Sequence, residues 1–328
     1  MTSKFSFALI ASTLALAVSC GEEKEDTQIE DPGCGVGIDE TVPAADATDA
    51  YYRADIEFHL DDADDSGATI ALTQGGTDVP GTTWLSEDNE VVYFTPDMPL
   101  APSTAYTATL TYCTGDASIN FTTSDLGTTL AADLLTNTYV IDLASARFVE
   151  PPGVGELIGE FVTMNVLVGV TAVTTSSITM MGALSVEGGT DQDWCTPTFD
   201  FPAADFMAAP YFSVIADEIT LSVAGYDIPL KDLEVSGTFA SDGSYFGGAI
   251  LGGTVDARDI VEMIDEVDTW EDACGLTASF GAPCVPCDDG VEACLTLLAD
   301  QIVAEQNPGQ VLEVVGEDDP RCKEDTSG

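Results

Sequence analysis

The sequence predicts a mainly β protein, in which a β-sandwich precedes an α+β domain made of an antiparallel sheet with C-terminal helices. Three observations predict this class. Short runs of alternating apolar residues, separated by turn residues, fill positions 35 to 125. Similar runs continue from about 130 to 255, and apolar stripes with helical spacing follow them. Alternation by two places side chains on one face of a strand, whereas spacings of three and four place them on one face of a helix.

The first 20 residues have the pattern of an export signal. Lys4 precedes the mostly apolar run Phe5–Val18, which is too short to span a bilayer as a mature helix. The run ends in LAVSC, which resembles the bacterial lipobox, where small residues precede a cysteine that is acylated. The resemblance implies a lipoprotein signal peptide at 1–19, lipidation of Cys20 and a bacterial cell-envelope location, at the outer membrane or cell surface or on the periplasmic face. The alternative is an ordinary signal peptide that ends near a cysteine.

Residues 20–34 are acidic, contain glycine and proline, and lack apolar periodicity, so we expect a tether. The whole chain carries 8 Lys and Arg against 58 Asp and Glu, a formal net charge of −50. Such a charge repels nucleic acid and anionic lipid. We therefore expect contact with the membrane through the acyl anchor, no nucleic-acid partner, and a protein or envelope partner whose identity is open.

Six runs within residues 35–125 read as strands: 53–60, 69–73, 81–85, 90–95, 104–113 and 117–123. That density of short strands is typical of a β-sandwich. The segments VPAADATDAYYRADIEFHL, VVYFTPDMPLAPSTAYTATLTY and INFTT resemble the bacterial immunoglobulin-like module of the S-layer (SbsA) type. The residues that carry the resemblance are Pro43, Phe58, Val92, Phe94, Pro96, Leu100, Pro102, Thr104, Tyr106, Phe121 and Thr123. The resemblance implies a spacer or adhesive unit.

Two features of this region are candidate sites. Asp62, Asp64 and Ser66, followed by Gly67, resemble the start of an EF-hand calcium loop, but the twelfth position is Thr73 rather than a bidentate glutamate. A solvated acidic turn is the alternative. The single histidine, His59, alternates with apolar neighbours and is expected to face solvent. With one histidine in the chain, a Ser-His-Asp triad would have to use His59, and a zinc site with several histidine ligands is excluded.

The second domain, predicted over residues 130–328, begins with further strand patterns: 138–149, 160–170, 177–186, 217–226, 233–239 and 245–255. Asp242-Gly243 lies between the last two and indicates a hairpin turn. Two helices are then expected. Asp256 is suited to cap Ala257–Val267, and Asp289 with Glu292 resembles a capping box for a helix over Val291–Gln306.

Apolar residues concentrate on the early strands of this domain. For a methionine-rich sheet, core packing is the ordinary interpretation. A curved sheet that encloses an apolar ligand is the alternative. The residues concerned are Met164, Leu167, Ile178, Met180 and Met181.

Export would place eight cysteines in an oxidising compartment, where an even number favours disulfide bonds. They are Cys34, Cys113, Cys195, Cys274, Cys284, Cys287, Cys294 and Cys322. We expect Cys34 to pair with Cys113, local pairing among residues 274, 284, 287 and 294, and Cys195 to pair with Cys322. The run Cys-Val-Pro-Cys at 284–287 resembles a thioredoxin-type motif but lacks βαβ context, and a lone C-x-x-C is weak evidence for zinc.

These patterns predict a non-catalytic envelope lipoprotein with a structural, adhesive or scaffolding role and no cofactor, calcium being the weak exception. The alternative function is a carrier of a lipid or another apolar ligand in the second domain. A hydrolase that uses two carboxylates is a third hypothesis, and the abundance of acidic residues prevents the choice of a pair.

Overall fold

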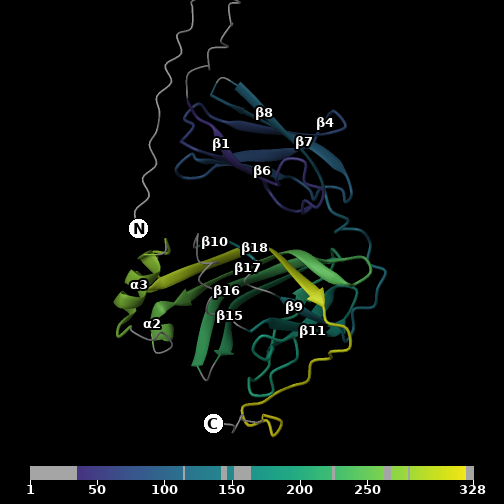
Figure 1. The fold of residues 1–328 in the computed structure, drawn as a ribbon, viewed down its shortest axis with the longest axis vertical. Helices are drawn as coiled ribbons and strands as arrows, with labels where there is room; N and C mark the ends of the chain where they lie inside the picture. Colours follow the sequence, from purple (N-terminus) through teal and green to yellow (C-terminus); the bar gives the residue numbers. More distant parts are fainter. Residues whose placement is uncertain are drawn as a thin grey trace, which may run out of the picture.

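The computed structural model describes residues 35–113, 115–141, 146–150, 164–223, 226–261, 267–279 and 281–322. The expected signal peptide, Cys20, the tether and Cys34 lie outside the described residues. Two β structures lie one above the other, with the N-terminal one at the top of Figure 1. The mainly β class predicted from the sequence is confirmed. Among the described residues, none of the helices combines the length and apolar character that a bilayer crossing demands.

The N-terminal structure is a sandwich of two antiparallel four-stranded sheets. The first sheet has the order β1 (Ile38–Val42), β2 (Ile56–Leu60), β6 (Val91–Pro96) and β5 (Gly81–Leu85). The second has the order β4 (Thr77–Asp78), β3 (Thr69–Gln74), β7 (Ala105–Tyr112) and β8 (Gly115–Thr122). The six predicted strands are all present, and the structure adds β1 and the short β4.

Alternation explains the sandwich core. The fully buried residues include Phe58 on β2, Val92 on β6, and Ala108 and Leu110 on β7. The side chains next to them along each strand point to the opposite face of the sheet. One face of each strand therefore enters the space between the sheets. The segment 46–50 lies along β8: Asp46 N donates to Asn120 O at 2.7 Å, and Thr122 N donates to Ala47 O at 2.8 Å. This segment covers one sheet edge of the sandwich.

The second structure is a sheet of ten antiparallel strands that closes on itself. Its order is β10, β18, β17, β16, β15, β14, β12, β11, β9; in addition, β13 pairs with β12, and β18 pairs with β9. The strands are β9 (Thr138–Ile141), β10 (Arg147–Glu150), β11 (Val166–Val173), β12 (Ser177–Leu184), β13 (Phe199–Asp200), β14 (Ala204–Asp205), β15 (Tyr211–Val223), β16 (Tyr226–Phe239), β17 (Tyr245–Asp256) and β18 (Cys294–Gln306). The β9–β18 pairing joins Ile141 to Ala304 and Tyr139 to Gln306.

Aromatic side chains fill the interior of this closed sheet. Phe239 is fully buried, and its ring centroid lies 5.1 Å from that of Phe212 and 5.5 Å from that of Phe246. Tyr139 and Phe206 complete the cluster at 5.3 and 6.2 Å from Phe239. A closed sheet of about eight strands is just wide enough for side chains to fill. The aromatic cluster therefore forms the main core of the second structure.

The prediction of a helix over Val291–Gln306 is wrong. Residues Cys294–Gln306 form β18, which pairs with β10, β17 and β9. A bulge at Gln301, where φ is 54°, shifts the inward phase, so that Ala299, Ile302 and Ala304 all face the core. The three-residue step from Ala299 to Ile302 is also a helical spacing. Pairing on both edges of β18 outweighs the local helix signal, because it satisfies a full row of backbone groups.

Two short helices do follow β17. Asp256 caps α2 (Ala257–Ile260) as predicted, since its side chain accepts a hydrogen bond from Arg258 N. The predicted extent of this helix reaches residues outside the described part of the chain. The second helix, α3 (Trp270–Ser279), was not predicted; Thr269 Oγ1 accepts from Asp272 N at 3.2 Å near its start. Asp242-Gly243 forms the β16–β17 turn as predicted, with Gly243 at φ 73°.

Candidate functional site

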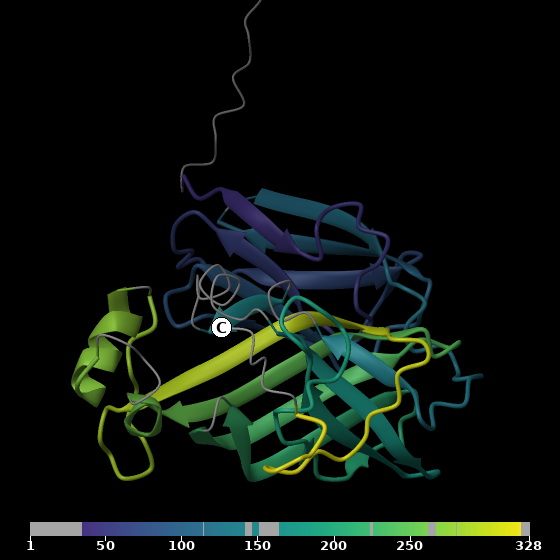
Figure 2. The same cartoon turned by 60° about the horizontal axis from the view of Figure 1, so that its bottom comes forward.

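Two groups of polar contacts lie between the sandwich and the closed sheet. In Figure 2, β18 (yellow) runs beneath the sandwich, so its outer face and that of its neighbours meet the N-terminal sheets. On one side of this interface, Tyr51 Oη lies 2.8 Å and Tyr52 Oη 3.4 Å from Thr238 Oγ1 on β16. The Arg53 guanidinium lies 3.9 Å from the centroid of the Tyr211 ring, a cation–π contact.

Burial raises the pKa of Tyr51, which remains a neutral hydroxyl at physiological pH. The ring lies against Gly248 on β17, where φ is 56° and a Cβ atom would overlap the Tyr51 ring. Gly248 lies in β17, which carries glycines at 247, 248, 252 and 253. Its missing side chain is what lets the sandwich approach β17.

Replacing Gly248 by alanine is expected to lower the free energy of unfolding by about 2 kcal/mol, because the new methyl group must displace Tyr51. Gly252→Ala on the same strand is the control, since its Cβ would meet only ordinary contacts at 3.7 Å or more. Urea unfolding of both variants measures the difference. Equal losses in the two variants would contradict a close approach at Gly248.

On the other side of the interface, an ion network joins the two structures. Arg147 on β10 donates to Glu57 Oε1 at 3.0 Å and to Asp300 Oδ2 at 2.5 Å. His59 Nε2 lies 2.8 Å from Glu57 Oε2. Burial alone would raise the pKa of Glu57, but the hydrogen bonds from His59 and Arg147 outweigh it and leave that pKa lowered. Glu57 is therefore a buried carboxylate held ionised by its partners.

The network corrects the expectation for His59. The residue does lie on the face opposite Ile56 and Phe58, as alternation requires. That face, however, is turned toward β10 rather than toward open solvent, and the His59 side chain is only 31% exposed. Local alternation carries no sign that a second structure covers this sheet.

Replacing Arg147 by methionine is expected to lower the free energy of unfolding by about 2 kcal/mol at pH 7. This loss lies between the loss measured for exposed ion pairs and the loss measured for fully buried ones, because the Arg147 pair is partly buried. Because the pKa of Glu57 is lowered, its contribution is complete above the ordinary pKa of glutamate and is lost as the pH falls through the lowered pKa. The gap between wild type and variant should therefore shrink in acid. Lys231→Met is the control, since its partner Asp288 is 85% exposed. A gap that does not change with pH would contradict this assignment.

A groove of about 490 Å³ lies where β1 meets the rim of the closed sheet. Its lining combines the second half of β1, the turn after it and the start of β17. Apolar side chains from both structures contribute, among them Val42, Leu126 and Val303. Glu40 and Asp49 bring carboxylates to the lining. The groove thus offers an apolar floor with acidic groups at hand.

The predicted calcium residues lie at a sandwich turn. Asp64 is 3% exposed and accepts hydrogen bonds from Ser66 N at 2.7 Å, Ser66 Oγ at 3.0 Å and Cys113 N at 3.1 Å. Burial raises the pKa of Asp64, but these donors outweigh it and leave the pKa lowered. Asp62 accepts from Ala63 N at 2.9 Å. Asp64 already serves the turn as a hydrogen-bond acceptor, and calcium binding stays a prediction.

The methionine-rich cluster divides between two faces. Ile178 and Met180 lie inside the closed sheet with the aromatic core. Leu167 and Met181 lie on the outer face, where Leu312 of the C-terminal segment packs against them. Met164 is half-buried just before β11. Core packing accounts for the described members of the cluster.

Six of the predicted cysteines form three disulfide bonds: Cys195–Cys322, Cys274–Cys284 and Cys287–Cys294. The bond expected between residues 195 and 322 is present, and residues 274 to 294 pair locally as expected. Cys113 is also a disulfide cysteine, and its expected partner Cys34 lies outside the described residues. The two cysteines of the Cys-Val-Pro-Cys run belong to different bonds, so they do not form a dithiol pair with each other.

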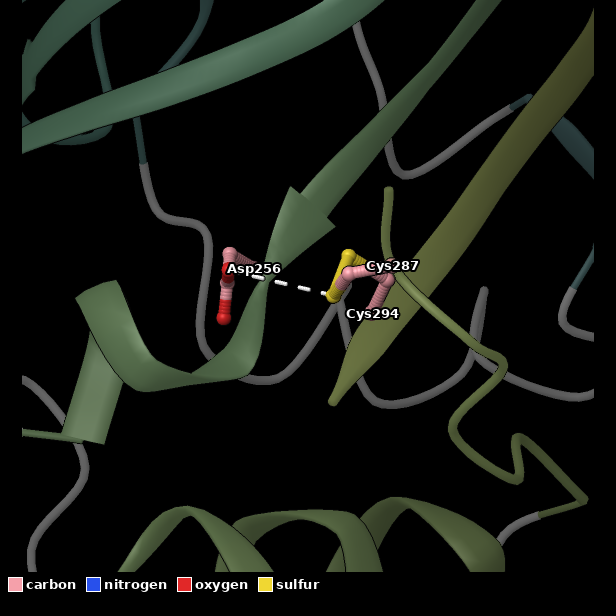
Figure 3. Close-up of side chains that lie close together, drawn as sticks. All are labelled: Asp256, Cys287 and Cys294. Carbon is pink, nitrogen blue, oxygen red and sulfur yellow. Dashed lines mark hydrogen bonds between the residues drawn. A yellow bond between two sulfur atoms is a disulfide. The ribbon is translucent and has the colours of Figure 1, made fainter. Parts of the chain in front are cut away.

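Asp256, Cys287 and Cys294 lie close together, as Figure 3 shows. They are the acidic and sulfur side chains that, within the described residues, come near enough to share a metal ion. The two sulfurs are bonded to each other, and Asp256 pairs with Arg258 at 2.5 Å. Thiolate ligands are what a zinc or iron site would need from cysteine. In this oxidised form the cluster braces the start of α2 rather than offering a metal site.

Sequence reasoning missed the interface residues Tyr51, Arg147 and Gly248. One signal was available. The chain has only 8 Lys and Arg among 66 charged residues, so each cation has many possible acidic partners. A rare arginine within a strand pattern, such as Arg147, is a candidate for a structural ion pair.

Comparison with known proteins agrees with the N-terminal assignment. A family model described as a bacterial Ig-like domain matches residues 35–129. This confirms the immunoglobulin-like character predicted for residues 35–125. No curated protein matches the chain.

Solved structures give only weak similarities. PcoC, a methionine-rich copper resistance protein from Escherichia coli, is 18% identical; the match covers 27% of this chain and 98% of PcoC, with a TM-score of 0.25. An L,D-transpeptidase from Mycobacterium smegmatis is 13% identical and covers 61% of this chain and 75% of its own, at 0.24. The S-layer protein SbsC, in the fragment rSbsC(31-844), is 9% identical and covers 86% and 54%, at 0.23. TM-scores this low support no functional conclusion.

Proposed function

We propose that this protein is a lipid-anchored, non-catalytic component of the bacterial cell envelope with a structural, adhesive or scaffolding role. The observation that carries the proposal is the bacterial Ig-like sandwich, fixed to a closed sheet by contacts on two sides. Contacts on two sides restrict the movement of one structure relative to the other. Rigid presentation of a surface at a distance from the membrane is what a scaffold or adhesive unit requires.

The chemistry of the described residues supports the non-catalytic part of the proposal. The lone histidine is hydrogen-bonded to Glu57 within the interface. The cysteines of the described second structure are in disulfide bonds. The carboxylates with the clearest pKa shifts are engaged by arginine, hydroxyl or backbone donors rather than facing one another across a cleft. Each of these groups therefore has a structural use.

Acylation of Cys20 tests the anchoring part of the proposal. In native host cells grown with a labelled fatty acid, the wild-type protein should become labelled and the Cys20→Ser variant should not. The variant should also leave the membrane fraction. Ser19→Ala is the control, because it keeps a small residue before the cysteine. Unchanged membrane retention of Cys20→Ser would contradict a lipid anchor.

A carrier role for the second domain has less support. A carrier needs a cavity, whereas Ile178 and Met180 pack into a core that also contains the rings of Phe212, Phe239 and Phe246. Native mass spectrometry of the protein purified from its host tests the choice. A lipid-sized mass bound in stoichiometric amount would favour the carrier, and the apoprotein mass with its acyl group would favour the scaffold.

A further inference from the structure

The groove at β1 has the size of a binding site rather than of a packing defect. Its volume of about 490 Å³ lies within the range of sites that enclose small ligands. Val42 and Pro43 from the sandwich and Leu126 and Val303 from below give it apolar walls. Val303 is 44% exposed although it lies between two folded structures. An apolar side chain of a partner would remove this surface from water.

One wall of the groove is a sheet edge. β1 ends its sheet and pairs with β2 alone, so the other edge of its backbone is not paired with a strand of the described chain. The neighbouring edge, β8, is already covered by residues 46–50. A free edge presents a row of N–H and C=O groups on which an extended peptide can add as a further strand.

The negative charge of the chain determines which kind of peptide can pair with the free edge of β1. Glu40 and Asp49 are exposed at the groove, and the whole chain carries −50. A second copy of this chain would be repelled, as would nucleic acid. Charged residues on an edge strand also oppose pairing between identical chains. A basic peptide, in contrast, is attracted by both the local and the overall charge.

The opposite wall adds a specific polar group. Gln301 of β18 lines the groove and has φ 54°, a left-handed conformation that costs a non-glycine residue free energy. Backbone outliers of this kind concentrate at binding sites. The carboxamide of Gln301 can both donate and accept, as pairing with a peptide group requires.

We propose that the groove binds a short extended segment of a basic protein partner. The segment adds to the free edge of β1, places an apolar side chain against Leu126 and Val303, and sets Lys or Arg side chains beside Glu40 and Asp49. This inference deepens the scaffolding role and rests on it, because it identifies the chemistry of the partner that the scaffold would hold.

Fluorescence anisotropy with the full-length protein and a labelled peptide, Lys-Val-Thr-Val-Lys-Val-Thr-Lys, tests the proposal. The wild type is expected to bind, and the double variant Glu40→Lys, Asp49→Lys is expected to bind at least about tenfold more weakly. Asp78→Lys with Asp116→Lys is the matched control. It changes the net charge equally on exposed parts of β4 and β8, outside the groove lining. Equal loss in both variants, or no binding by the wild type, would overturn the proposal.

A second pair of variants separates the groove from general charge. Ala44 lines the groove and its exposed neighbour Ala45 does not. Ala44→Trp should fill the groove and weaken peptide binding by at least about tenfold, while Ala45→Trp should leave it within about twofold. Circular dichroism and melting temperature establish that both variants fold. Unaltered binding by a folded Ala44→Trp would place the peptide elsewhere and overturn the proposal.

The peptide backbone distinguishes strand addition from simple attraction. Methylating alternate amide nitrogens of the peptide keeps its charge and removes half of its donors, so strand addition predicts near-complete loss of binding. An acidic peptide with Glu for Lys should not bind. Equal binding of the methylated peptide would overturn the inference. That failure would leave the envelope role intact, because Cys20→Ser labelling tests the latter independently.

Discussion

Removing the disulfide bond between Cys195 and Cys322 is expected to lower the free energy of unfolding by about 4 to 5 kcal/mol, the largest effect of any change considered for this protein. The bond joins residues 127 apart, and the entropy that a cross-link removes from the unfolded chain grows with the length of the loop it closes. The measurement is urea unfolding of the double variant Cys195→Ser, Cys322→Ser.

Noncovalent contacts hold the same C-terminal segment. Gln192 Nε2 donates to Glu313 O at 2.7 Å, Glu313 N donates back at 3.0 Å, and the Arg321 guanidinium lies 3.9 Å from the Trp194 ring. The variant should therefore fold, with lower stability. Cys274→Ser with Cys284→Ser is the control, because its shorter loop predicts a loss of about 2 to 3 kcal/mol. If both double variants lost equal stability, loop length would not be the reason.

Replacing Phe239 by alanine is expected to cost about 4 kcal/mol. Phe239 is fully buried and contacts four other rings, so removing it deletes apolar contact and leaves a cavity that rigid neighbours fill only in part. Met207→Ala is the control, since that side chain is 78% exposed. Thermal unfolding by calorimetry measures both. A loss below about 1 kcal/mol for Phe239→Ala would mean that the closed sheet is not packed as described.

The sandwich could be predicted from the sequence because its strands obey simple alternation. Val92 with Phe94, and Tyr106 with Ala108 and Leu110, place one face of each strand in the core without interruption. The short β4 has two residues and leaves too little pattern to detect. The six runs that were long enough all became strands, and the family match to residues 35–129 agrees with them.

The second structure was harder to predict because its strands contain bulges. In β18 the left-handed Gln301 inserts one residue, so Ala299 and Ile302, which are three residues apart, both face the core. The spacing of apolar residues alone could not distinguish a helix from a bulged strand. The deciding fact, that β17 and β9 flank this segment, lies about 50 and 160 residues away in the sequence. Local sequence carries no record of such distant partners.

The candidate site was predictable only in its parts. The cysteine count led to the prediction of disulfide bonds, because an even number of cysteines in a chain that is expected to be exported favours pairing. The interface was not predicted, since Glu57 is an ordinary polar residue of a strand and only the rarity of arginine pointed to an ion pair at Arg147. The same is true of the β1 groove, whose walls come from separate parts of the chain.

The pairing of β9 with β18 has a consequence for the order of folding. Tyr139 meets Gln306 at the seam, so the first strand of the closed sheet waits for the last before the ring is complete. Contacts this distant in sequence slow folding and leave hydrophobic surface open in the meantime. The sandwich, complete by Thr122, has no such delay. During synthesis it is therefore complete first, and the aromatic interior of the closed sheet stays exposed until the chain has almost ended.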